Sequence, residues 1–237
     1  MLSWETNILD FTQPSVMLTI TAGYLASTLG MKHHMRNRKA YDLKFAMQTY
    51  NILQVILNLY MIQGLYKLPW MSKTPNLFAI NTFYSKDIQY YVLVHYLSKY
   101  LDFFDTYFMI LRKKNNQLSF LHVYHHATIG LIWGGLLHVG HGNGTAAFGC
   151  LINSVIHTIM YSHYWYTALG YNNPFKKLIT QAQMLQFFLC IVHSVSVLIW
   201  EYVYPREIAW IQFIYHIQMI VLFRNFYKKN YKRLNIE

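Results

Sequence analysis

The sequence has few charged residues and very few cysteines. Asp, Glu, Lys and Arg make up 12% of its 237 residues, about half the share of a soluble domain, whereas 54% are hydrophobic and 18% aromatic. The two cysteines, Cys150 and Cys190, lie far apart in apolar segments, which excludes a disulfide framework and a CxxC metal or redox site. We expect both thiols to be buried. This composition predicts a membrane protein.

The chain also lacks segments that would divide it or mark it for cleavage. No Pro-, Gly- or Ser-rich linker is present, so we expect residues 1–237 to form a single integral membrane domain. The first ten residues contain Glu5 and Asp10 but no Lys or Arg, and so lack the basic region of a cleaved signal peptide. The net charge of +11 does not indicate nucleic acid, because the basic residues lie between apolar stretches.

Seven apolar stretches have the length of about 20 residues that a helix needs to cross a bilayer. Many contain Tyr, His, Asn and Gln. Because polar groups are costly in hydrocarbon, we expect these side chains to face a shared interior. The sequence thus predicts an all-α membrane protein with seven transmembrane helices. The predicted spans are approximately 14–31, 45–66, 88–111, 118–138, 146–168, 178–203 and 207–226.

Lys and Arg are distributed unevenly between the loops that join these spans. Fifteen follow spans one, three, five and seven, whereas four lie on the other side. Since cytosolic loops are enriched in Lys and Arg, this predicts a cytosolic C-terminus and an N-terminus outside the cytosol or in a lumen. Three basic residues after span three could also attract a phosphate-rich substrate at the cytosolic mouth. They are Arg112, Lys113 and Lys114.

The stretch HYLSKYLDFFDT carries two acids inside the third span, Asp102 and Asp105. On a continuous helix they share an arc of about 120° with His95, Lys99 and Thr106. A cation beside carboxylates lowers the cost of charge in a membrane, because each ion has a partner. The stripe is interpreted either as a polar wall of a reaction chamber or as an ion-pair network that fixes helix packing.

The stretch LHVYHHAT places His122, His125 and His126 on one face of the fourth span. Di-iron oxygenases and desaturases also carry histidine boxes, but their two metals need many imidazoles from several boxes. Here one HxxHH is present, and the HxxH of His138 and His141 begins about 16 residues, or roughly 24 Å, further along the helix. We therefore expect no metal site.

Chemistry by imidazole itself is the alternative to a metal. Neutral imidazole can attack a thioester, and a second imidazole can move protons. No GxSxG elbow is present and neither cysteine is next to a histidine, so a histidine nucleophile for acyl transfer fits the residues.

Two further polar stripes lie in spans five and six. In NSVIHTIMYSHYWY, one helical face carries Asn153, His157, Tyr161 and Tyr164, whereas His163 is offset by about 120° from His157. The stretch TQAQMLQF adds a second stripe. These amides and hydroxyls either join helices by hydrogen bonds or contribute to a site. The residues of the second stripe are Thr180, Gln183 and Gln186.

Together these stretches resemble the ELO family of very-long-chain fatty acid elongases. KYLDFFDT looks like the family's KxxExxDT motif, LHVYHH is its HxxHH box, NSVIHTIMY its NSxxHxxMY motif and TQAQMLQF its TxxQxxQF motif. Two positions differ: Asp102 stands where the family usually has Glu, and His163 where an aromatic residue is commoner. FLHVYHHAT and LRKKNNQ look most like the polyunsaturated fatty acid elongases.

The resemblance implies a fold in which helices two to seven form an inverted barrel around a substrate tunnel. It implies a very-long-chain 3-oxoacyl-CoA synthase, which condenses acyl-CoA and malonyl-CoA. His125 would accept the acyl group, with His157 and His126 in acid/base or acyl-handling roles. The other residues expected in the chamber are Lys99, Asp102, Asp105, His122 and Asn153. Those expected to contact substrate are Arg112, Lys113, Lys114, Tyr161, Gln183 and Gln186.

The resemblance also implies the surroundings of the reaction. It places the protein in the endoplasmic reticulum membrane, in contact with lipid, with acyl-CoA and malonyl-CoA as substrates and no cofactor. Partners from the elongation cycle would be a ketoreductase, a dehydratase and an enoyl reductase, and a homo-oligomer is compatible with it. A di-iron oxygenase and a lipid or ion transporter are the competing interpretations of the polar stripes.

Overall fold

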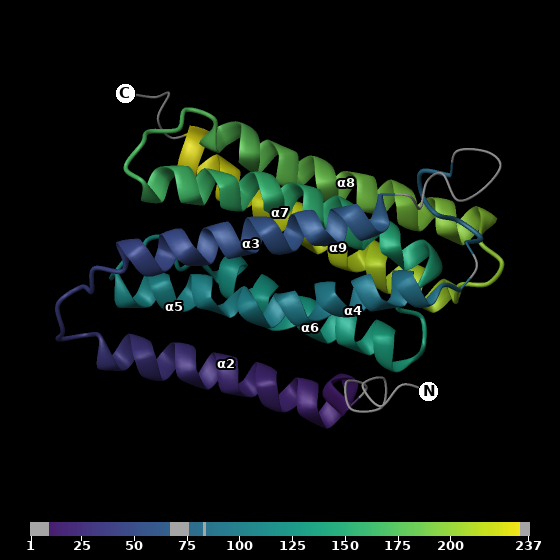
Figure 1. The fold of residues 1–237 in the computed structure, drawn as a ribbon, viewed down its shortest axis with the longest axis horizontal. Helices are drawn as coiled ribbons and strands as arrows, with labels where there is room; N and C mark the ends of the chain where they lie inside the picture. The colour runs from purple at the N-terminus through teal and green to yellow at the C-terminus, as the bar shows by residue number, and fades with distance from the viewer. Residues whose placement is uncertain (1–9, 67–75, 83, 233–237) are drawn as a thin grey trace. The chain divides into compact units, whose positions relative to one another are not determined.

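The computed structural model describes residues 10–66, 76–82 and 84–232, which contain eight α-helices and no β-strand (Figure 1). Each of the seven predicted spans is helical, which confirms the all-α prediction. Glu5, Lys67, Lys73 and Arg233, on which parts of the sequence prediction rest, lie outside the described residues. The α-helices are α2 (Pro14–His34), α3 (Lys44–Leu65), α4 (Lys86–Leu101), α5 (Phe103–Leu111), α6 (Phe120–His138), α7 (Ala147–Ala168), α8 (Lys176–Trp200) and α9 (Arg206–Tyr227).

The predicted span 88–111 consists of two helices, α4 and α5, that are separated by Asp102. The N–H of Asp102 donates to the carbonyl of Ser98 at 3.1 Å, but the N–H of Asp105 donates to the carbonyl of Asp102 at 3.2 Å. The second bond joins residues three apart, as in a tightened 3₁₀ turn. The residues before and after Asp102 therefore do not lie on one regular helix. The predicted polar stripe is offset at the residues that follow Asp102.

The chain folds into two compact units. Unit 1 comprises Met1–Leu43 and Val92–Gly142, and unit 2 comprises Lys44–Tyr91 and Asn143–Glu237. Helix α4 begins in unit 2 and continues into unit 1. The single integral membrane domain stays a prediction.

In unit 1, α2 packs against α5 and α6. Tyr24 of α2, Phe103 of α5 and Ala127 of α6 form a buried core. Gly134 allows close packing on α6, because a Cβ there would overlap the sulfur of Met17 and approach the ring of Tyr96 to 2.7 Å. Helix α6 therefore contacts both α2 and the unit 1 part of α4 at a position where only glycine fits.

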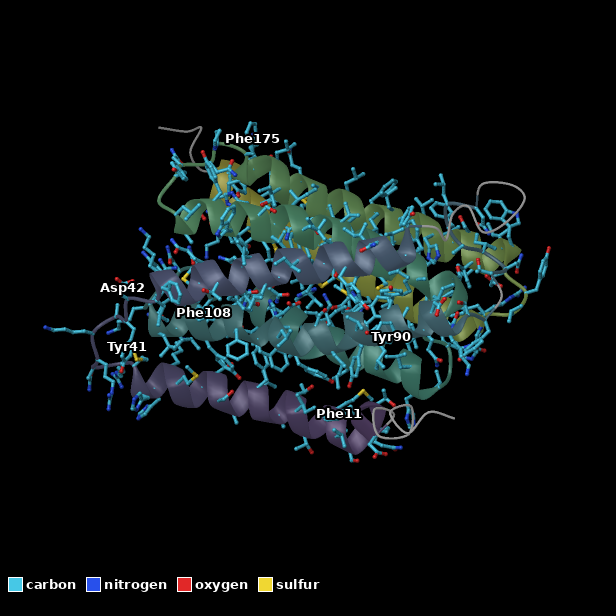
Figure 2. All side chains as sticks on the ribbon, in the orientation of Figure 1. Phe11, Tyr41, Asp42, Tyr90, Phe108 and Phe175 are labelled. Atoms are coloured by element: carbon cyan, nitrogen blue, oxygen red, sulfur yellow. The ribbon has the colours of Figure 1, made fainter. Side chains whose placement is uncertain are left out.

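Both ends of α2 are fixed by hydrogen bonds within unit 1. The hydroxyl of Tyr96 donates to the carbonyl of Phe11 at 2.7 Å, just before α2, where Figure 2 labels Phe11. After α2, the N–H of Tyr41 donates to the carbonyl of Leu111 at 3.0 Å. The first helix is thus an integral part of unit 1.

In unit 2, α3 packs along α7, α7 against α8, and α8 against α9 (Figure 1). Helix α3 buries the amides Asn51, Gln54 and Asn58, whereas Ile52 and Ile56 are exposed. This is the reverse of a soluble helix, and it fits an outer face in hydrocarbon with polar groups turned inward. The prediction that polar side chains face the interior is confirmed for these three residues.

Both cysteines lie in unit 2, on α7 and α8. Cys150 and Cys190 are buried free thiols, as predicted.

By length and apolar composition, one of the described helices, α8, is suited to crossing a membrane. The polar residues in the other helices lower their hydropathy, as the amides of α3 illustrate. Membrane crossing by those helices and the inverted barrel with its tunnel stay predictions.

Candidate functional site

A helix cap fixes the start of the histidine box. Ser119 precedes α6 in an extended conformation, and its hydroxyl accepts a hydrogen bond from the N–H of His122 at 3.2 Å. The ring centroids of His122 and His126 are 4.2 Å apart, and those of His125 and His126 are 5.3 Å apart. His126 is buried and His125 is half-buried. The structure thus brings together three of the predicted catalytic residues.

The second histidine pair lies away from this box. Helix α6 runs without a break from Phe120 to His138, so His138 is at the far end of the helix from His122. His141 follows in the turn after the helix. The expectation of no shared metal assumed a continuous helix from His122 to His138, and this helix is confirmed.

Lys99 and Asp102 form a buried ion pair in unit 1. The Lys99 Nζ lies 3.4 Å from the Asp102 Oδ2, and each side chain is 2% exposed. Lys99 is in the last turn of α4, where the helix dipole favours a cation. Asp105 is half-buried in the first turn of α5. The expected pairing of the cation with a carboxylate is confirmed for Asp102.

A chain of hydroxyl groups connects α2 to the histidine box. The Tyr24 hydroxyl lies 2.8 Å from the Thr106 Oγ1, which lies 2.8 Å from the His122 Nε2. Tyr24 and Thr106 are buried. Thr106 belongs to the predicted stripe of KYLDFFDT, but no motif includes Tyr24, and no periodic signal singles it out among the residues of α2.

In unit 2, α7 carries the next group of predicted residues. The rings of His157 and Tyr161 are 5.6 Å apart at 68°, and both side chains are buried. The Tyr161 hydroxyl lies 3.3 Å from that of Tyr50 on α3. Asn153, one turn before His157, is half-buried. The structure thus brings His157 and Tyr161 together on one face of α7, as predicted.

The glutamines of α8 extend this group within unit 2. The Gln183 Nε2 donates to the sulfur of Met160 on α7 at 3.4 Å, and Gln186 is buried. The Gln183 amide thus joins α8 to α7, and substrate contact by the two glutamines stays a prediction. The residues of α6 belong to unit 1 and those of α7 and α8 to unit 2, so a single chamber that contains all of them stays a prediction.

The basic residues Arg112, Lys113 and Lys114 follow α5 in a defined turn. The N–H of Lys113 donates to the carbonyl of Ile110 at 3.0 Å, and that of Lys114 to Met109 at 2.8 Å. Lys113 has a φ of 56°, which makes this a Schellman motif with lysine where glycine is usual. The Lys113 Nζ donates to the carbonyls of Arg36 and Arg38 at 3.2 and 2.8 Å. Substrate binding by the three residues stays a prediction.

A buried polar cluster around His193 in unit 2 was not singled out by sequence. The Gln212 Nε2 donates to the His193 Nδ1 at 2.9 Å. The ring is therefore protonated on Nε2, which lies 3.1 Å from both the Thr145 Oγ1 and the Phe78 carbonyl. The ring also stacks on Phe148 at 4.6 Å. With both nitrogens bonded, His193 connects α8 and α9 to the segments before α4 and α7.

The chain matches the ELO family, described as the GNS1/SUR4 family, over residues 10–236. It is 46% identical over 230 residues to fatty acid elongase 5 of Leishmania major, covering 97% of this chain and 90% of that protein. It is 43% identical over 223 residues to fatty acid elongase 5 of Trypanosoma cruzi, covering 94% and 87%. It is 36% identical over 215 residues to very long chain fatty acid elongase 5 of Mus musculus, covering 86% and 70%.

Proposed function

The chain belongs to the ELO family, and from this premise we propose that it is the condensing enzyme of fatty acid elongation. The reaction joins a long-chain acyl-CoA and malonyl-CoA to give 3-oxoacyl-CoA, CO2 and CoA. Relatives named fatty acid elongases support chain elongation as the process. The histidine box of α6, with ring centroids 4.2 and 5.3 Å apart, is the observation that carries the proposal to a specific chemistry.

The first half of the reaction transfers the acyl group to His125. An imidazole nitrogen attacks the thioester carbonyl, the C–S bond breaks, and CoA leaves as a thiolate that takes up a proton. His125 suits this role because it is half-buried, whereas its neighbour His126 is buried. His126 and His157 handle the protons or the acyl group.

The second half forms the carbon–carbon bond. Malonyl-CoA loses CO2, and the electron pair of the broken bond remains as an enolate. The enolate carbon attacks the acyl-imidazole carbonyl, and the C–N bond to His125 breaks to release 3-oxoacyl-CoA. Donors from Lys99 or Asn153 stabilise the oxyanion that develops at each attack. Loss of CO2 drives the condensation, and these steps use no redox cofactor or metal.

The remaining predicted residues support these two steps. Asp102 pairs with Lys99 in a buried position, and His122 and Asp105 complete the polar wall. Tyr161, Gln183 and Gln186 line the acyl path in unit 2, and the basic turn after α5 attracts the CoA phosphates. The substrate preference we propose is polyunsaturated acyl-CoA, because FLHVYHHAT and LRKKNNQ resemble that branch of the family.

We place the protein in the endoplasmic reticulum membrane, with seven spans, a lumenal N-terminus and a cytosolic C-terminus. The fifteen Lys and Arg on one side of the spans, against four on the other, support this orientation. Its product needs reduction, dehydration and a second reduction before the next cycle. A ketoreductase, a dehydratase and an enoyl reductase are therefore the partners we propose.

A condensation assay with a panel of acyl-CoAs tests the proposal. Purified protein with malonyl-CoA labelled at its free carboxyl should release labelled CO2 only when an acyl-CoA is present, and faster with polyunsaturated chains. Activity should survive chelator and anaerobic conditions, which a di-iron oxygenase would not. The proposal would be overturned by an intact protein that releases no CO2 with an acyl-CoA of any chain length. It would also be overturned by a protein that transports lipid across liposome membranes without changing the lipid chemically.

A further inference from the structure

We infer that Tyr24 of α2 is a positioning residue for the histidine box, acting through Thr106 on His122. The inference rests on the proposed function and deepens it. In the barrel expected from the resemblance, helices two to seven surround the substrate, so the first helix, α2, would lie outside. The hydrogen bonds of unit 1 give α2 a direct connection to the box.

The three groups form an uninterrupted chain. Both steps, from the Tyr24 hydroxyl to the Thr106 Oγ1 and from there to the His122 Nε2, are 2.8 Å. Tyr24 is 2% exposed and Thr106 is fully buried. A buried polar group that loses its hydrogen-bond partner costs the full free energy of its desolvation. The two hydrogen bonds therefore hold Tyr24, Thr106 and His122 in one geometry.

Donor strength gives the chain a direction. A phenol is a better donor than an aliphatic hydroxyl, and each hydroxyl has one hydrogen. Tyr24 then donates to Thr106, Thr106 donates to the Nε2 of His122, and the proton of the neutral imidazole lies on Nδ1. This fixes both the rotation and the tautomer of the His122 ring.

The effect of His122 on its neighbours follows from ring packing. Its ring lies 4.2 Å from that of His126, which lies 5.3 Å from that of His125. A rotated His122 ring would displace His126, which handles protons or the acyl group in the proposed reaction. Loss of the Tyr24 hydroxyl should therefore slow the chemical steps without weakening the binding of acyl-CoA.

The protein has a second hydrogen bond between α2 and α5 that provides a matched control. The hydroxyls of Ser27 on α2 and Tyr107 on α5 also lie 2.8 Å apart. This hydrogen bond joins α2 to α5 as the Tyr24 bond does, but among the described residues no further hydrogen bond leads from it to a histidine. Tyr107→Phe removes one such bond and leaves the box unchanged.

The test compares Tyr24→Phe with Tyr107→Phe. Tyr24→Phe keeps the ring that stacks on Phe103 at 4.1 Å, and should lower kcat about tenfold with an unchanged KM for acyl-CoA. Tyr107→Phe should retain wild-type kcat. In the Thr106→Val background, Tyr24→Phe should have no further effect, because the chain is already broken. Equal losses in both tyrosine variants, or independent losses from Tyr24→Phe and Thr106→Val, would overturn the inference.

Wild-type activity separates this inference from the proposed function. If the wild type releases no CO2 from malonyl-CoA, the condensing function fails and the positioning role fails with it. If the wild type is active but Tyr24→Phe equals wild type in kcat, the positioning role alone fails. Thermal unfolding of the same variants accompanies the kinetics, so that a loss of folded protein is not counted as a loss of kcat.

Discussion

The histidine box of α6 in unit 1 and the buried His193 in unit 2 differ in how their ring nitrogens are used. His193 uses both nitrogens in hydrogen bonds to Gln212, Thr145 and Phe78. In the box, the His122 Nε2 is hydrogen-bonded to Thr106 of α5, which is bonded in turn to Tyr24 of α2. The His193 ring connects helices through both of its nitrogens. The His122 ring is hydrogen-bonded through Nε2 and packs against another imidazole.

This difference indicates two kinds of histidine within the predicted membrane spans. A lone histidine with both nitrogens bonded to amide, hydroxyl and carbonyl groups stabilises helix packing. A cluster of imidazoles in contact, with a half-buried member such as His125, fits the chemistry that we propose. Substitutions in the histidine box and at His193 test this difference directly.

The largest effect is expected from His125→Ala. The change removes the proposed nucleophile, so turnover should fall by about a thousandfold or more, and mass spectrometry should find no acyl adduct on the protein. His138→Ala, at the far end of the same helix, is the control and should retain activity. An adduct that persists in His125→Ala would place the nucleophile elsewhere and break the comparison.

The Lys99–Asp102 pair should separate a catalytic charge from a structural one. Lys99→Met alone leaves a buried carboxylate and should lower the free energy of unfolding by about 3–5 kcal/mol. Lys99→Met with Asp102→Leu removes both charges and should fold nearly as stably as the wild type. If Lys99 stabilises an oxyanion, the double variant should still lose about 10²–10³-fold in kcat. A stable double variant with full activity would make the pair purely structural.

His193→Leu should affect stability and leave catalysis intact. It removes the hydrogen bonds of His193 to Gln212, Thr145 and the Phe78 carbonyl. Gln212 still donates to the Cys190 carbonyl and Thr145 to the Phe78 carbonyl, so the free energy of unfolding should fall by about 1–3 kcal/mol. Thermal unfolding measures this loss, and kcat per folded molecule should equal the wild type. A normally stable His193→Leu protein without condensation activity would show that unit 2 carries a second functional histidine cluster.

The smallest effect is expected from Asp102→Glu, which restores the residue usual in the family. The longer side chain should still pair with Lys99, since the present Nζ to Oδ2 distance of 3.4 Å leaves room for adjustment. We expect kcat within about threefold of wild type, because the buried pair keeps both charges. A loss as large as that of the double variant would mean that the shorter carboxylate is required by this chain's own geometry.

Much of the helical fold could be predicted from the sequence, because largely apolar stretches of about 20 residues recur along it, even where polar residues lower their hydropathy. The seven spans match the helices to within a few residues. The break at Asp102 could not be predicted, since neither Pro nor Gly marks it and the tightened turn depends on local hydrogen bonding. Lys113 in the left-handed region was also missed, because glycine is the expected residue at that position.

The candidate site could be predicted where several polar or ionisable residues recur at helical spacing. The three histidines of α6 and the pair of Lys99 and Asp102 were found in this way. Tyr24 was not, because a single tyrosine in an apolar helix has no periodic partner, and its connection to His122 depends on tertiary packing of α2 against α5. His193 was overlooked for the same reason.

The Ser119 cap has a consequence for how loop length can vary in this chain. Because α6 starts at a residue fixed by its own side chain, the direction in which the histidines point is set after residue 119 and not by the loop before it. One residue added within 115–118 should leave the box facing the same way, whereas one added between Ser119 and His122 would turn it by about 100°. Insertions and deletions should therefore be tolerated up to the cap and excluded just after it.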